Sequence, residues 1–227
     1  MHNSLKASLL ITVCFLCACS KNGGITIKTE NISENNDAYT INCESVEIEH
    51  NSDGGKLLND TFKNELDEWI ETFTSQALQV KVPGSSPPCL QVRHIVKNNN
   101  GKLLSIITEK YVYLSGLHGN TWVTAKNFDT QQDNILKLGD LFSDKEYPVI
   151  LNLRMEELIK NNPETYHDLW EKPIIDGNRE DKFYLDGKNL VIFYEPYELS
   201  YYARGVVEFS IPIEKIRGYI KAEYLPS

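Results

Sequence analysis

Residues 58–77 read LNDTFKNELDEWIETFTSQA. Large or small apolar side chains recur in this stretch at steps of three and four residues: Leu58, Phe62, Leu66, Trp69, Phe73 and Ala77. This spacing is typical of an amphipathic helix that buries one side against another layer. The Pro- and Gly-rich run from Pro83 to Pro88 ends the predicted helix. The stretch therefore predicts a helix that covers a neighbouring sheet.

Segments with the composition of β-strands lie on both sides of this helix. One precedes it and three follow it in close order: residues 39–49, 89–96, 102–114 and 121–128. The pair Asn100-Gly101, between the first two of the later segments, is a strong hairpin signal. We therefore predict an α+β fold, in which an antiparallel sheet packs against amphipathic helices.

A second unit of helix and strands follows along the chain. Apolar residues at helical spacing come after Pro148, which suits the first turn of a helix. Further strands are predicted at residues 182–195, with a turn inside that segment, and at 205–212. We divide the domain into an N-terminal half, residues 38–135, and a C-terminal half, residues 136–227, and expect the two to be closely associated.

The first 18 residues have the three parts of an export signal: a basic start with Lys6, an apolar run up to Leu16, and small residues before Cys19. The run is too short to span a membrane. The tetrapeptide that ends at Cys19 fits the lipobox, in which the thiol receives a lipid. We expect a signal peptide at 1–18, a flexible tether at 19–37, and a lipoprotein anchored on the extracytoplasmic side of the cell membrane or outer membrane. An ordinary secretory signal is the alternative.

Composition limits the partners and the covalent framework. The net charge is −9 and no basic run interrupts the acidity, so nucleic acid is not an expected partner. Cys43 and Cys89 remain after the signal and the lipidated cysteine are set aside. Outside the cytoplasm such a pair can form a disulfide, and two buried thiols are the alternative.

Motifs for catalysis are missing from the sequence. The histidines that follow the signal occur singly, at His50, His94, His118 and His167, without metal-ligand spacing. No nucleophile elbow, phosphate-binding loop or dinucleotide fingerprint occurs. We therefore expect no metal, no cofactor and no enzyme activity. Glycosidase carboxylates meet in space rather than in a motif, so an enzyme that modifies cell-wall glycan stays an alternative.

Two segments have the composition of ligand-binding loops. In the turn at 115–120, two glycines that we expect to adopt positive φ angles bracket His118, and Asn120 follows. His118 either fastens this turn to the backbone or contacts a ligand. The loop at 194–205 carries Tyr197, Tyr201 and Tyr202, whose rings either form a recognition surface or fold inward over the sheet.

The same segments carry a family resemblance. The pieces that match are Ser115-Gly116-Leu117-His118-Gly119-Asn120, Asn127-Phe128-Asp129, Leu136 to Phe142, Phe183-Tyr184-Leu185, Phe193 to Leu199, and Gly205 to Ile213. In this order they resemble a family of extracytoplasmic domains that includes the N-terminal region of the peptidoglycan deacetylase PdaC and the outer domain of the anti-sigma factor RsiV. The similarity extends over nearly all of residues 39–215.

The resemblance implies an outer-surface α+β domain that senses a ligand or associates with the cell wall, with lysozyme recognition in the RsiV type. The metal motifs of the deacetylase domain do not occur in this sequence. We therefore expect a non-catalytic lipoprotein that binds peptidoglycan or a lysozyme-like protein, with His118, Asn120 and the three tyrosines as candidate contacts. An envelope structural protein is a further alternative.

Overall fold

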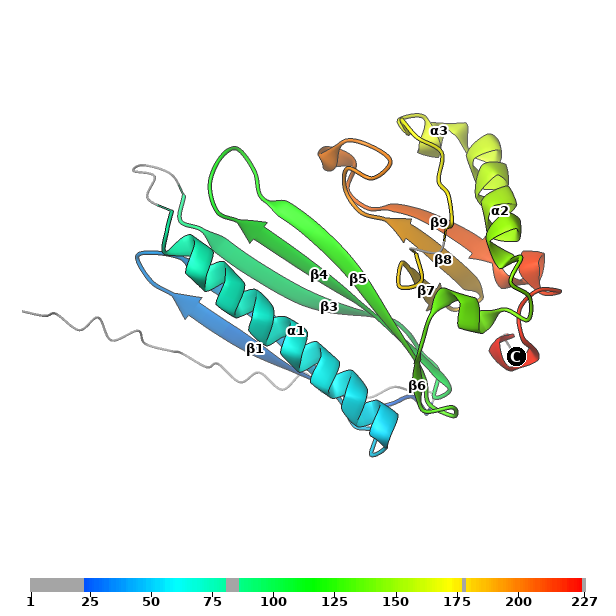
Figure 1. The fold of residues 1–227 in the computed structure, drawn as a ribbon, viewed down its shortest axis with the longest axis horizontal. Helices are drawn as coiled ribbons and strands as arrows, with labels where there is room; N and C mark the ends of the chain where they lie inside the picture. The colour runs from blue at the N-terminus through cyan, green and yellow to red at the C-terminus, as the bar shows by residue number, and fades with distance from the viewer. Residues whose placement is uncertain (1–22, 81–85, 177–178, 226–227) are drawn as a thin grey trace, which may run out of the picture. The chain divides into compact units, whose positions relative to one another are not determined.

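The computed structural model describes residues 23–80, 86–176 and 179–225 (Figure 1). The described residues form two sheets and three α-helices, which confirms the α+β class. The strands are β1 Ile27–Asn35, β2 Thr40–Ile48, β3 Cys89–Asn99, β4 Leu103–Tyr113, β5 Asn120–Asp129, β6 Asn134–Leu136, β7 Phe183–Asp186, β8 Asn189–Tyr194 and β9 Val207–Pro212. The α-helices are α1 Asp53–Ala77, α2 Tyr147–Asn161 and α3 Pro163–Tyr166.

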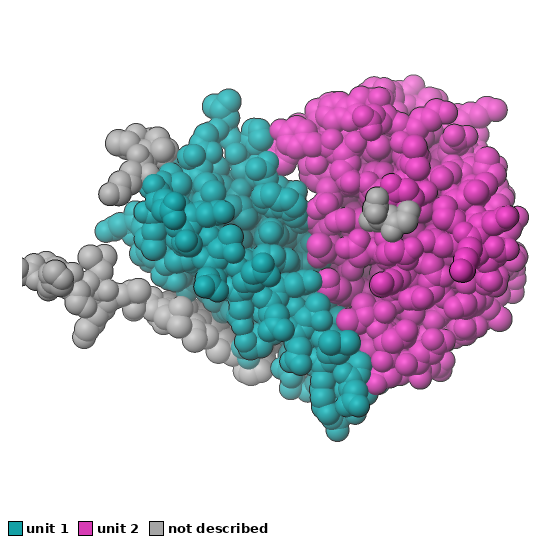
Figure 2. Space-filling model, viewed as in Figure 1, with its two compact units in different colours: residues 1–94, 108–122 teal, residues 95–107, 123–227 magenta. Residues whose placement is uncertain are grey.

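The chain divides into two compact units (Figure 2). Unit 1 contains residues 1–94 and 108–122, and unit 2 contains residues 95–107 and 123–227. These units do not coincide with the predicted halves, residues 38–135 and 136–227. The physical reason is that β3, β4 and β5 are long strands, and each of them contributes residues to both units.

The larger sheet has six strands in the order β1-β2-β3-β4-β5-β6. β1 and β2 are antiparallel and pair without interruption from Ile27 opposite Ile48 to Asn35 opposite Thr40. β2 and β3 are parallel, although an antiparallel sheet was predicted. The parallel pair follows from α1, because a helix between two neighbouring strands returns the chain to the same end of the sheet.

The predicted amphipathic helix is α1, which lies over one face of the unit 1 sheet (Figure 1). Ser52 caps its first turn, since its hydroxyl oxygen accepts the N–H of Gly55 at 3.0 Å. The buried side chains that join the helix to the sheet are Tyr39, Ile41, Cys43, Leu66, Phe73, Ala77, Leu90 and Val92. This core fixes the helix against the strands that carry the candidate site.

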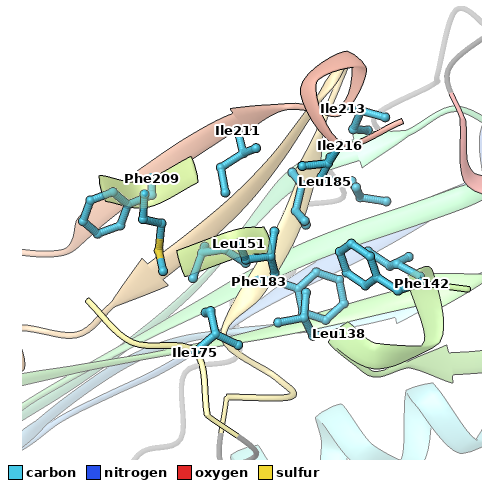
Figure 3. Packing of buried hydrophobic residues seen from close by; sticks show 14 of the residues in the cluster. Leu138, Phe142, Leu151, Ile175, Phe183, Leu185, Phe209, Ile211, Ile213 and Ile216 are labelled. Carbon is cyan, nitrogen blue, oxygen red and sulfur yellow. The ribbon is translucent and has the colours of Figure 1, made fainter. Parts of the chain in front are cut away.

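In unit 2, α2 and the three-stranded antiparallel sheet β7-β8-β9 share one apolar core. Figure 3 shows Leu151 of α2 packed among side chains of this sheet, including Phe183 and Phe209. Pro148 lies in the first turn of α2, as predicted. The amide of Asn127 is buried beside this core. Its oxygen accepts a hydrogen bond from a serine hydroxyl at 2.7 Å, and its nitrogen donates to a backbone carbonyl at 2.9 Å.

The predicted flexible tether at 19–37 is wrong for residues 27–35. Residues 27–35 form β1, because their backbone groups pair with β2 and the Ile27 side chain is buried. The predicted signal peptide at 1–18 and the lipidation site Cys19 lie outside the described residues. Among the residues that are described, no helix is both long and apolar enough to cross a membrane.

Cys43 and Cys89 are free thiols, so the bridge that the sequence left open is not formed. In the parallel pairing of β2 with β3, Cys89 lies opposite Thr40 and Cys43 lies opposite Val92. The two cysteines are thus out of register by three residues, about 10 Å along the strands, and an odd offset puts their side chains on opposite faces. Burial raises the pKa of the Cys43 thiol to about 12, which keeps it protonated.

Candidate binding groove in unit 1

The hairpin turn between β4 and β5 contains the glycines that bracket His118. Gly116 has a φ of +97°, as predicted. Gly119 does not adopt a positive φ, so that part of the prediction is wrong. Gly119 instead allows its backbone to pack closely against neighbouring groups. An added Cβ would lie 2.5 Å from the carbonyl oxygen of Val112 and 2.6 Å from the ring of Tyr111. Glycine is needed at both positions, for two different reasons.

His118 is exposed and also bonded to the turn. Its Nδ1 lies 2.8 Å from the carbonyl oxygen of Gly119, and because a carbonyl only accepts, Nδ1 carries the proton. The hydroxyl of Tyr113 donates to the carbonyl of Gly116 at 3.1 Å and ties down the other side of the turn. His118 therefore has the fastening role that was one of the two alternatives, and it also lines the groove described next.

A groove of about 400 Å³ lies between the C-terminal half of α1 and the end of the β4–β5 hairpin. We call it the Trp groove. Its helix side is lined by Glu68, Trp69, Thr72, Phe73 and Gln76. Its strand side is lined by Lys110, Val112, Leu114, Ser115, His118, Gly119, Asn120 and Trp122. All of these residues belong to unit 1.

Two indole rings and one ammonium group dominate the lining. The Nζ atom of Lys110 lies 4.9 Å from the ring centroid of Trp69 and 4.8 Å from that of Trp122. Both distances are within the range of cation–π attraction, which holds the lysine beside both rings. Trp122 is 42% exposed, and Trp69 is partly buried against the core under α1. The groove thus offers apolar ring surface together with polar groups at its margin.

The structure brings two of the five candidate ligand residues to this groove, His118 and Asn120. The three candidate tyrosines belong to unit 2. Tyr197 and Tyr201 are 51% and 50% exposed, and the rings of Tyr197 and Tyr202 lie 5.5 Å apart between centroids. Tyr197 has a φ of +74°, a backbone conformation that a non-glycine residue rarely adopts.

Charged pairs hold the base of this tyrosine loop. Arg179 donates to Glu198 at 2.5 Å, and its guanidinium lies 3.6 Å from the ring centroid of Tyr194. Lys182 pairs with Glu195 at 2.9 Å. These side chains are largely buried, so each charge requires its partner. These ion pairs therefore fix the ends of the loop that carries the exposed tyrosine rings.

Sequence reasoning missed Trp69, Lys110 and Trp122 as site residues. Trp69 was assigned to the apolar stripe of the helix, which is correct but incomplete. A signal for Trp122 was present: it is out of phase with Val123 and Ala125, two buried residues that follow it in β5. An exposed tryptophan on a strand is uncommon enough to suggest a binding surface. Lys110 carries no comparable signal.

Comparisons with known proteins agree with this fold. Residues 139–214 match the family described as "Protein of unknown function (DUF3298)". No curated protein matches the chain. A crystal structure of a DUF3298 family member from Bacteroides fragilis is similar, with a TM-score of 0.69 and 18% identity over 89% of this chain and 96% of that one. A DUF3298 family protein from Pseudomonas aeruginosa has a TM-score of 0.65 and 17% identity over 88% and 96%. The chain therefore contains a DUF3298-like segment within a fold that solved proteins of that family share.

Proposed function

We propose that the chain is a lipid-anchored, non-catalytic binding module of the cell envelope, and that its Trp groove binds a cell-wall glycan. The lipobox that ends at Cys19 supports the anchor and the extracytoplasmic location. The observation that carries the glycan proposal is the pair of indole rings, Trp69 and Trp122, lining one groove.

The chemistry of the groove suits a sugar. Sugar rings have C–H faces that pack on aromatic rings, and hydroxyl groups that need hydrogen-bond partners at the edge. Trp69 and Trp122 supply the ring surface. Thr72, Gln76 and Asn120 supply neutral donors and acceptors around it. Aromatic surface combined with polar groups that fix the orientation of a ligand is common in small-ligand sites.

Binding without catalysis is supported by the lining of the same groove. Among the described residues, Glu68 is the single carboxylate that lines it. A glycosidase uses two carboxylates that flank the scissile bond. The rival enzyme predicts that peptidoglycan incubated with the chain releases new reducing ends, and that Glu68→Gln stops the release. An envelope structural protein predicts neither turnover nor binding.

The test compares two exposed tryptophans in the mature chain, residues 19–227 with Cys19→Ser. Soluble peptidoglycan fragments should bind with a dissociation constant of about 0.1 mM or tighter, roughly −5.5 kcal/mol. Trp122→Ala should weaken this binding at least about tenfold, as expected for an aromatic anchor. Trp170→Ala is the matched control, because Trp170 is 53% exposed but lies in unit 2.

Equal affinities for the two variants and the parent chain would reject the groove as the site. If no peptidoglycan fragment binds to the chain at about 0.1 mM, the glycan proposal itself is rejected.

A lysozyme-like protein is the second candidate ligand, and the tyrosine loop favours it. Exposed rings such as Tyr197 and Tyr201 are enriched at protein interfaces, and the positive φ of Tyr197 is a local strain of the kind that binding sites retain. Immobilised mature chain should then capture lysozyme, and Tyr201→Ala should reduce the capture. Capture that Tyr201→Ala leaves unchanged would argue against this loop.

A further inference from the structure

The sheet of unit 1 has a second hollowed face, opposite the Trp groove. Side chains alternate along a strand, so Lys110 and Val112 face the groove while Glu109 and Tyr111 point to the other side. There a hollow of about 590 Å³, larger than the Trp groove, draws its lining from all five strands β1 to β5. The hollow is separate from the site proposed above, since the two share no lining residue.

Three side-chain amides dominate this hollow. Asn42 and Gln91 are exposed and lie directly opposite each other in the β2–β3 pairing, and Asn31 joins them from β1. Within the described part of the chain, none of these three side chains has a hydrogen-bond partner. Each amide offers two donor hydrogens and an acceptor oxygen. A row of such groups matches neighbouring hydroxyls, which also donate and accept.

The charged side chains of the hollow form hydrogen bonds with other groups of the protein. The Nε–H of Arg93 donates to Glu109 at 2.6 Å. A carboxylate oxygen of Glu44 accepts the backbone N–H of His94 at 2.9 Å. The two carboxylates, Glu44 and Glu109, and the single guanidinium of Arg93 give the lining a net negative charge. This charge disfavours phosphates and acidic sugars. Tyr111 accepts the N–H of Gly119 through its hydroxyl oxygen at 3.3 Å, so its own O–H can donate to a ligand.

We propose that this face is a second binding site, which takes an uncharged polyhydroxylated chain, a neutral oligosaccharide. The strands β1 to β5 are neighbours in that order. At about 4.8 Å between strands, four spacings give a track of about 19 Å, long enough for several linked sugar rings. A peptide that extends a sheet needs an unpaired strand edge, whereas this site is a sheet face. The inference does not depend on the function proposed for the Trp groove.

The test is an NMR titration of the ¹⁵N-labelled mature chain with neutral tetrasaccharides: cellotetraose, maltotetraose and the tetramer of N-acetylglucosamine. At least one should shift the side-chain NH₂ signals of Asn42 and Gln91 at or below about 10 mM, the weak end of measurable affinity. An acidic tetrasaccharide with alternating uronic acid units should bind at least about tenfold more weakly, because of the extra carboxylate.

The double variant Asn42→Ala, Gln91→Ala should weaken the neutral ligand at least about tenfold. Both residues are exposed, so the fold should be retained. Gln131→Ala removes an exposed amide in unit 2 and should change nothing. No shift of these amides with any of the three sugars, tighter binding of the acidic sugar, or full affinity in the double variant would overturn the proposal. Binding in the Trp groove is followed separately, through the indole N–H signal of Trp122.

Discussion

Acid should destabilise unit 1 through His94. Its Nε2 donates to the carbonyl of Glu44 at 3.1 Å, and its Nδ1 accepts the hydroxyl of Thr108 at 2.9 Å. The ring also packs edge-on against Phe62, with 5.4 Å between centroids. This arrangement fits the neutral imidazole, with its single hydrogen on Nε2. Burial lowers the pKa of His94 from 6.5 to about 4, although the nearby Glu44 acts in the opposite direction.

The size of this destabilisation follows from the difference between the pKa values of His94 in the folded and unfolded states. The folded state has the lower pKa, so the stabilising contribution is complete above pH 6.5 and is lost as the pH falls towards 4. A difference of about 2.5 pKa units, at about 1.4 kcal/mol each, corresponds to about 3.5 kcal/mol in full, of which about 3 kcal/mol is lost between pH 7 and pH 4. This is a large fraction of the 5 to 15 kcal/mol that typically separates folded and unfolded states.

Urea denaturation of the mature chain at a series of pH values measures this loss. His94→Gln is the reference, because glutamine can donate and accept in a similar way but does not titrate. Between pH 7 and pH 4 it should lose about 3 kcal/mol less stability than the parent chain. Equal losses in both proteins, or an NMR titration of the His94 ring centred near 6.5, would refute the reasoning.

Three further predictions concern single positions. Gly119→Ala should lower the free energy of unfolding by about 1 to 3 kcal/mol, measured by urea denaturation, because its Cβ would lie 2.5 Å from the Val112 carbonyl oxygen. Mass spectrometry after denaturation and alkylation should find both Cys43 and Cys89 modified without prior reduction; an unmodified pair would mean that they are bridged. Asn127→Leu should cost about 1 to 3 kcal/mol in the same denaturation assay, since two buried partners lose their hydrogen bonds; an unchanged midpoint would contradict it.

Periodic apolar patterns predicted most of the secondary structure. The stripe from Leu58 to Ala77 became α1, and the three segments after it became β3, β4 and β5. These predictions succeeded because each pattern reflects burial of one side of a single element. β1 was missed because most of its residues are polar and read as a linker. β1 forms because its backbone pairs with β2 at the edge of the sheet. The composition of residues 27–35 alone does not indicate a strand.

The candidate site was predictable only in part. His118 and Asn120 were found because glycines mark the turn that holds them. Trp69, Lys110 and Trp122 come from a helix and two strands, and they meet only after α1 has packed on the sheet. No local spacing relates such residues, so their convergence was out of reach of a reading along the chain. The same limit applies to the amides of the opposite face, where Asn42 meets Gln91 only through the β2–β3 register.

The indole N–H signals of the mature chain test the central proposal most directly. Soluble peptidoglycan fragments added up to about 1 mM, well above the proposed dissociation constant, should shift the signals of Trp69 and Trp122 together. The signal of Trp170, in unit 2, should stay in place. Shifts confined to Trp170, or no shift of any indole signal, would contradict a glycan-binding role for the Trp groove.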